Sequence, residues 1–199
     1  MRALIVYAHP RSGSFNEAIR DIILQRLKGY GVEIRMRDLY DEAFNPVMDK
    51  LQLENYQDHL QNKAGLEEYV ADLLWCDMLI FVYPTWWYGL PAILKGWLDR
   101  VFLPGIAFHM PLGQGKNISP SLTRITKLAI FTTCGASWWL TQFVGSPGKR
   151  TILRGVRLLC ARNCKVAYLA HYLMDSSTEE SRNTHLSKVA RKLDSLVKR

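Results

Sequence analysis

The chain has 199 residues, 48% of them hydrophobic, and its 26 basic and 18 acidic residues give a formal charge of +8 at pH 7. This length and composition predict one domain over residues 1–199. The four cysteines form no Cys-x-x-Cys pair and show no zinc-type spacing with histidines, so we expect neither a disulfide nor a metal site. The first apolar run is too short for a signal peptide and no stretch reaches the ~18 residues of a membrane span, so we expect a cytoplasmic protein without membrane insertion.

The chain opens with a strand, a loop and a helix. Arg2–Ala8 is a nearly all-apolar, β-branched run, which is typical of a parallel strand covered on both faces. His9–Asn16 follows as a loop, and the next apolar residues recur at the three-and-four spacing of a helix up to Leu27. Ser14 and Glu17 form a capping-box pattern at its start, and two glycines mark its end.

The remaining elements continue this alternation. We expect strands over residues 32–37, 78–83, 127–133 and 165–172, and helices over 66–75, 91–102 and 178–198, with another helix opening at Ser146–Pro147. Residues 38–63 are irregular, with one helix in their later part, and residues 103–124 form a long loop with three prolines and three glycines. The pattern predicts an α/β flavodoxin-like fold: a doubly wound five-stranded parallel sheet, order 2-1-3-4-5, with helices on both faces.

In such a sheet, ligands bind beyond the carboxyl ends of the strands where the strand order reverses, so three loops are candidates. The first, His9–Asn16, places Ser14 at a helix N-terminus, where free amides favour a phosphate and where His9 can add a hydrogen bond or a charge. On spacing alone, a simple helix cap beside an exposed histidine is an equally good interpretation. The loop has neither a P-loop nor a Rossmann pattern.

The other two loops are unusual in composition. Residues 83–91 hold four aromatics and two prolines, which suits stacking against a planar ring, although an ordinary core or a dimer contact explains them slightly better when they are taken alone. Thr132–Ala136 has small residues that let the backbone approach a ligand, and two tryptophans follow. We expect Cys134 to be a packing residue, because no histidine lies near it in the sequence to activate it.

Positive charge is concentrated in one part of the chain. Between Asp99 and Asp175 there is no acidic residue, and the basic residues there are Arg100, Lys116, Arg124, Lys127, Lys149, Arg150, Arg154, Arg157, Arg162 and Lys165. Such a stretch attracts anions, and the alternatives are a solvated face without a partner, nucleotide phosphates and, as the weakest, nucleic acid. No nucleic-acid motif is present, so we expect no nucleic-acid partner.

Residues 81–102, Phe-Val-Tyr-Pro-Thr-Trp-Trp-Tyr-Gly-Leu-Pro-Ala-Ile-Leu-Lys-Gly-Trp-Leu-Asp-Arg-Val-Phe, closely resemble the signature of the NAD(P)H quinone dehydrogenase family of the flavodoxin-like superfamily. Other matching pieces occur in the family's order from residue 2 to about 136. They are Ala3–His9 with Ser14–Asn16, Asp38–Tyr40, Phe44–Pro46, and Thr132–Thr133 with Gly135. The rest of the chain is similar only in its pattern of strands and helices.

The resemblance implies a homodimer with a non-covalent flavin, which takes a hydride from NADPH or NADH and passes two electrons to a quinone. It implies a flavin phosphate side at His9, Ser14, Phe15 and Asn16, an isoalloxazine edge at Pro84, Thr85, Trp86, Trp87 and Tyr88, and an opposite rim at Thr132, Thr133, Cys134 and Gly135. It implies a substrate pocket at Phe108, Met110 and Trp87. Relatives use a tyrosine and a histidine after the fourth strand, but neither type occurs between Met110 and Tyr168, so no catalytic side chain is assigned.

Several alternatives stay open. FMN is preferred to FAD because the chain lacks the C-terminal extension of longer FAD-binding relatives. The basic run Lys149–Arg157 suits either an adenylate pyrophosphate or the 2′-phosphate of NADPH, and Arg150, Arg154 and Arg157 are expected on one side of a helix. Other possible functions are a flavin-binding ancillary or regulatory subunit of a transport system, a reductase of azo or nitro compounds, and an electron-carrier flavodoxin, which the basic composition disfavours.

Overall fold

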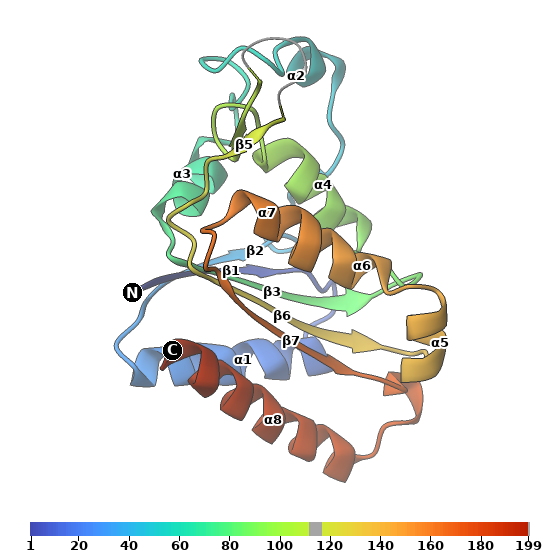
Figure 1. The fold of residues 1–199 in the computed structure, drawn as a ribbon. Coiled ribbons are helices and arrows are strands. Elements are labelled where there is room, and N and C mark those ends of the chain that lie inside the picture. Colours follow the sequence, from blue (N-terminus) through green and yellow to red (C-terminus); the bar gives the residue numbers. More distant parts are fainter. Residues whose placement is uncertain (112–116, 199) are drawn as a thin grey trace.

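The computed structural model describes residues 1–111 and 117–198. Its main sheet has five parallel strands in the order β2-β1-β3-β6-β7 (Figure 1). The strands are β1 (Arg2–Tyr7), β2 (Glu33–Asp38), β3 (Met78–Thr85), β6 (Lys127–Cys134) and β7 (Lys165–His171). This confirms the predicted order 2-1-3-4-5. The numbering differs because two short strands, β4 (Phe108–His109) and β5 (Ser119–Pro120), pair with each other outside the main sheet.

Helices cover both faces of the sheet, as predicted. On one face lie α1 (Phe15–Gly29) and α8 (Glu179–Val197), and on the other lie α3 (Glu67–Trp75), α4 (Ala92–Val101) and the helical segment 147–159 (Figure 1). Successive side chains of a strand point to opposite faces, so Leu4 packs in one core and Ile5 in the other. The buried Trp97 of α4 packs against Phe81 of β3 and completes the larger core.

The start of α1 follows its sequence signal with one difference. Oγ of Ser14 accepts a hydrogen bond from the N–H of Glu17 at 3.2 Å, as a helix cap should. The Glu17 carboxylate accepts from the N–H of Gly13 at 2.5 Å, one position earlier than in a capping box. After the helix, Gly31 has φ +64°, a conformation that favours glycine and turns the chain toward β2.

Other helices depart further from expectation. The helix expected within residues 38–63 is α2 (Lys50–Glu54), only five residues long. The sequence pattern missed α5 (Trp138–Phe143) and a 3₁₀ turn, η2 (Met174–Ser176), because six and three residues are too few to show a helical period. Both lie at the carboxyl-end side of the sheet: η2 contributes Met174 and Asp175 to the site described below, and α5 begins two residues after Ala136, which also lines that site.

The helix that opens at Ser146–Pro147 is irregular. It runs as α6 (Pro147–Arg150), a π-helical segment η1 (Thr151–Val156) and α7 (Arg157–Leu159). The wider π turn shifts the helical spacing, so the expected basic face is incomplete. Arg150 and Arg154 are exposed, whereas Arg157 is half-buried and donates to the carbonyl of Cys164 at 3.3 Å.

Among the described residues, no helix is long and apolar enough to cross a bilayer. No group of three or more His, Cys, Asp or Glu side chains in residues 1–111 and 117–198 could hold a metal ion. The four cysteines are free and buried. Lys116 and part of the long loop 103–124 lie outside the described residues.

Candidate cofactor-binding site

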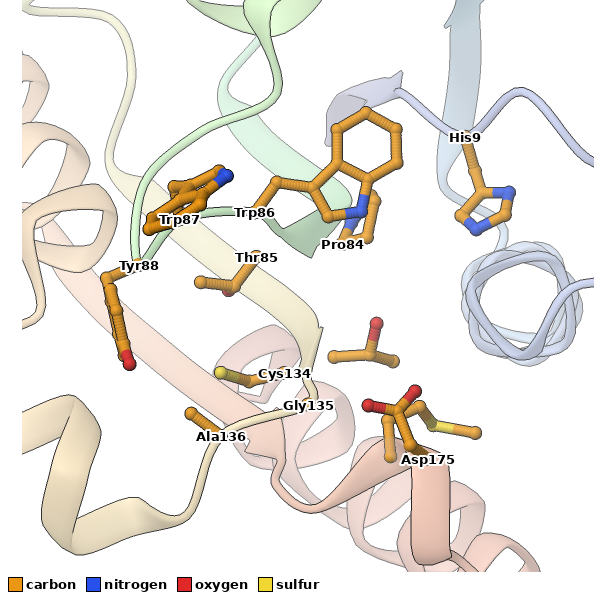
Figure 2. A pocket seen from close by; sticks show the side chains of 12 residues that line it. His9, Pro84, Thr85, Trp86, Trp87, Tyr88, Cys134, Gly135, Ala136 and Asp175 are labelled. Carbon is orange, nitrogen blue, oxygen red and sulfur yellow. The ribbon is translucent and has the colours of Figure 1, made fainter.

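An open cavity of about 870 Å³ lies at the carboxyl ends of four strands (Figure 2). Its walls come from the loops after β1, β3 and β6, which are the three predicted loops, and from the segment after β7. The lining residues are His9, Pro84, Thr85, Trp86, Trp87, Tyr88, Thr133, Cys134, Gly135, Ala136, Met174 and Asp175. The structure therefore brings together most of the residues singled out from the sequence.

One end of the cavity has donors suited to an anion. Nδ1 of His9 lies 3.1 Å from the backbone nitrogen of Arg11, from which it can accept, and 3.2 Å from the carbonyl oxygen of Arg11, to which it can donate. In the tautomer that accepts from Arg11, the ring proton is on Nε2. Partial burial lowers the pKa of His9, so at pH 7 this ring offers a hydrogen bond and not a full charge. Phe15 and Asn16 begin α1, and the first amides of a helix have no acceptor within the helix. These amides and the helix dipole favour a phosphate nearby.

Two predicted residues support the cavity from behind. Asn16, 2% exposed, donates from Nδ2 to Oγ1 of Thr133 at 2.9 Å, and its Oδ1 has no hydrogen-bond partner among the described residues. The hydroxyl of Thr132 donates to the carbonyl of Tyr83 at 2.6 Å and lies 2.8 Å from the hydroxyl of Thr85. These bonds join the start of α1 to β6, and β6 to β3, which fixes the spacing of the loops.

Ser14 and Phe15 are also absent from the cavity wall. The hydroxyl of Ser14 caps α1, as described above. The ring of Phe15 packs against His171 and His185, with ring centroids 5.3 and 5.8 Å apart. Any contact of these residues with a cofactor would be through the backbone or the hydroxyl, and their assignment remains a prediction.

The aromatic wall is an unusual turn. Trp87 and Tyr88 have φ angles of +48° and +61°, in the left-handed region of backbone conformation that residues other than glycine rarely adopt. The N–H of Gly89 donates to the carbonyl of Trp86 at 2.9 Å and closes the turn. The ring of Trp87 is 95% exposed, so this large apolar surface has almost no contact with the rest of the chain. Strained backbone and an exposed planar ring together are typical of a binding site.

The opposite wall is formed by Gly135, Ala136, Met174 and Asp175. Gly135 and Ala136 belong to the predicted loop 132–136, whereas Met174 and Asp175 were not predicted. A Cβ atom on Gly135 would lie 2.6 Å from Oδ2 of Asp175, so a side chain at position 135 would displace the Asp175 carboxylate from its place at the cavity. Cys134 is 5% exposed and its Sγ lies 3.7 Å from Oγ1 of Thr141, as expected of a packing residue. Met174 and Asp175 follow β7, so the rule that ligands bind at the carboxyl ends of strands is the sequence signal that points to them.

The expected substrate residues Phe108 and Met110 do not line this cavity. Phe108 belongs to β4 and pairs with Pro120 of β5, away from the four strand ends. Among residues 1–111 and 117–198, no lysine or arginine lines the cavity either. Lys149, for example, has its Nζ 4.6 Å from the centre of the Tyr168 ring. Roles for Phe108, Met110 and the basic run in binding remain predictions.

An apolar surface lies beside the cavity on α5. Trp138, Trp139 and Phe143 are 49%, 77% and 88% exposed, and the two indoles contact each other edge to face at 4.9 Å. We call these three residues the α5 patch. Large exposed apolar groups that cluster in this way usually mark an interaction surface.

The chain is similar to known proteins with a flavodoxin-like fold. The family model described as "Flavodoxin-like fold" matches residues 1–197. An uncharacterized NAD(P)H oxidoreductase of Haemophilus influenzae is 37% identical over 138 residues, which cover 69% of this chain and 66% of that protein. The ribosyldihydronicotinamide dehydrogenase [quinone] of Rattus norvegicus is 28% identical over 216 residues, which cover 99% of this chain and 92% of that protein.

A solved structure supports the fold and gives an example of a bound flavin. The FMN-dependent NADH-azoreductase of Bacillus anthracis, in complex with FMN, superposes with a TM-score of 0.79 at 15% identity and covers 98% of each chain. At this identity the likeness concerns the fold alone.

Proposed function

We propose, for a chain that belongs to the flavodoxin-like fold family, that the protein is a flavin-dependent NAD(P)H:quinone oxidoreductase. NADPH or NADH would first bind in the pocket and pass a hydride to the flavin. After the oxidised nicotinamide leaves, a quinone would bind in the same pocket and take up two electrons. The relatives support the coarser part of this proposal, since one is named an NAD(P)H oxidoreductase and another a quinone dehydrogenase. We further propose that residues 1–199 are a single domain, which one continuous sheet supports.

The observation that carries the proposal is the convergence of strand-end loops on one cavity. A flavin mononucleotide is a planar ring joined to a phosphate. The cavity has an exposed indole at one wall, a glycine at the other and, at one end, His9 of the loop that leads into the N-terminus of α1. The orphaned Oδ1 of Asn16 is a buried acceptor in the same region. These features fit FMN in shape and in polarity.

Each group would have a limited task. A bound flavin supplies the hydride-accepting and electron-donating chemistry, so no side chain has to react. His9 would donate from Nε2 to the phosphate, the turn of Trp87 and Tyr88 would cover one edge of the ring, and Gly135 would let backbone come close to the other. Thr132, Thr133 and Asn16 would keep these walls at a fixed separation through the bonds given above.

A homodimer is part of the proposal. The α5 patch adjoins the cavity, and a second copy of the chain would remove its three large rings from water. We expect the protein to sediment as a dimer at micromolar concentration and Phe143→Glu to shift it toward monomer, because a buried carboxylate without a partner is costly. Leu60→Glu, a change at another exposed apolar residue that lies outside the patch, is the matched control. A wild-type monomer at all concentrations would remove the dimer from the proposal.

Turnover tests the enzymatic assignment. Protein loaded with FMN or FAD is mixed with NADPH or NADH, and the loss of reduced nicotinamide is followed with a quinone, with an azo dye or with no acceptor. We expect fast oxidation only with an acceptor, and faster oxidation with the quinone. Fast azo reduction without quinone reduction would favour an azoreductase, as in the Bacillus anthracis protein. Slow turnover with every acceptor in flavin-loaded protein would favour an ancillary flavin-binding subunit.

A further inference from the structure

Gly148 contacts the aromatic turn without lining the cavity itself. It lies in α6, and its N–H donates to the carbonyl of Tyr88 at 3.2 Å. A Cβ atom on Gly148 would meet C, Cα and O of Gly89 at 3.0, 3.2 and 3.2 Å. Backbone atoms of a tight turn cannot swing aside as the end of a long side chain can, so only glycine fits here without displacing the turn.

The turn depends on such outside support. Trp87 and Tyr88 are both in the left-handed region, which L-residues adopt only when their surroundings impose it. Within the turn, the bond from Gly89 to the carbonyl of Trp86 closes the loop, and the Tyr88 carbonyl is held by Gly148. Trp87 has almost no contacts of its own, because its ring is 95% exposed. The position of Trp87 therefore follows from the backbone of the turn.

The corner that carries Gly148 is connected to the end of β6 through Ser146 and Thr141. Ser146, 5% exposed and with φ +50°, donates from Oγ to the carbonyl of Thr141 at 3.1 Å and accepts from Nε2 of Gln142 at 3.1 Å. Thr141 reaches β6, where its hydroxyl lies 3.7 Å from Sγ of Cys134. A chain of contacts thus runs from the end of β6 through Thr141 and Ser146 to Gly148, and from there to the aromatic turn.

We infer that Gly148 is a positioning residue of the cofactor pocket: the corner that carries it sets how far the Trp86–Gly89 turn stands from the Cys134–Gly135 wall. The inference rests on the proposed function, because it takes this gap to be the place of the flavin ring. A side chain at position 148 would push the turn out of line and weaken flavin binding, although residue 148 does not line the cavity.

The test compares Gly148→Ala with Gly155→Ala. Gly155 follows in the same helical segment, and a Cβ there would meet no atom within 4 Å, so it controls for the change of glycine to alanine. Amide hydrogen exchange is measured on the flavin-free proteins, and the dissociation constant of FMN is measured by quenching of its fluorescence. We expect Gly148→Ala to speed exchange of peptides covering residues 85–90 and to raise the dissociation constant about tenfold, with β1 unchanged. Gly155→Ala should behave as wild type.

The outcomes separate the inference from the proposed function. Unchanged exchange over residues 85–90 in Gly148→Ala overturns the inference, whatever the affinity for FMN. Faster exchange with an unchanged dissociation constant also overturns it, because the turn would then not determine flavin binding. Wild-type protein that binds no FMN overturns the proposed function, and the inference falls with it.

A second variant covers the case in which Gly148→Ala does not fold. Ser146→Gly keeps a residue suited to φ +50° and removes the hydroxyl that bonds Thr141 and Gln142. We expect the same change over residues 85–90 in a smaller degree, with a weaker affinity for FMN. Wild-type exchange and affinity in this variant would contradict the inference equally.

Discussion

His185 should make the stability of the protein depend on pH. This residue of α8 is 5% exposed, and its ring lies 4.9 Å from that of His171 and 5.8 Å from that of Phe15. Its Nε2 has no partner among the described residues. Burial, together with repulsion from His171 and Lys188, lowers the pKa of His185 from 6.5 to about 4. The folded protein thus keeps this imidazole neutral where an unfolded chain would protonate it.

The size of the effect follows from linkage. Between pH 6.5 and pH 4 the unfolded chain binds more protons at this position than the folded chain, so the free energy of unfolding falls as the pH falls. The contribution is fully present above pH 6.5. At pH 5 a shift of this size has removed about 2 kcal/mol, since one pKa unit corresponds to about 1.4 kcal/mol. Carboxyls such as Asp77, whose pKa is lowered by a hydrogen bond from Arg2, lose their contribution only at lower pH.

Urea unfolding at pH 8 and pH 5 measures this loss. His185→Phe keeps a ring in place and removes the titration, so we expect it to lose about 2 kcal/mol less than wild type between the two pH values. His109→Phe, a change at an exposed histidine, controls for the loss of an imidazole in general. Equal losses in wild type and His185→Phe would refute the reasoning, because the buried ring would then not be held neutral.

Three further changes test the core, an ion pair and a cap. Trp97→Ala should lower the free energy of unfolding by about 3–5 kcal/mol in urea titrations, because Trp97 is 0% exposed. The control Leu60→Ala, at a residue that is 85% exposed, should change this free energy by less than about 0.5 kcal/mol. Asp72→Asn should cost about 2–3 kcal/mol by the same measure, since Nε of Arg37 contacts its buried carboxylate at 2.5 Å; an unchanged midpoint would mean that the contact contributes nothing. Ser14→Ala removes the cap of α1 and should cost about 1 kcal/mol in thermal unfolding, and a change below 0.3 kcal/mol, roughly the limit of the method, would count against the cap.

The sheet could be predicted from the sequence because its strands are buried on both faces. Runs such as Met78–Tyr83 are apolar throughout. A short apolar run between two helices is typical of a parallel strand that helices cover on both faces. Loops at the carboxyl ends of these strands then follow from topology alone. For this reason the sequence alone predicts His9, the turn from Trp86 to Tyr88 and Gly135, all of which line the cavity.

The direction of individual side chains was harder to predict. The family resemblance implies that Asn16 and Thr132 contact the cofactor, but hydrogen bonds to Thr133 and Tyr83 turn their side chains to the back of the wall. Asp175 was missed because its approach to the cavity depends on a three-residue helical turn and on the absence of a side chain at Gly135, neither of which leaves a periodic signal. Such contacts depend on tertiary packing between distant segments.

A crystal structure of the protein grown with FMN is the most direct test of the central claim, that four strand ends form one flavin site. The account predicts density for the ring between the Trp87–Tyr88 turn and Gly135, with the phosphate near His9 and the start of α1. Density for FMN on another face of the molecule, or a cavity without it at saturating FMN, would contradict the account.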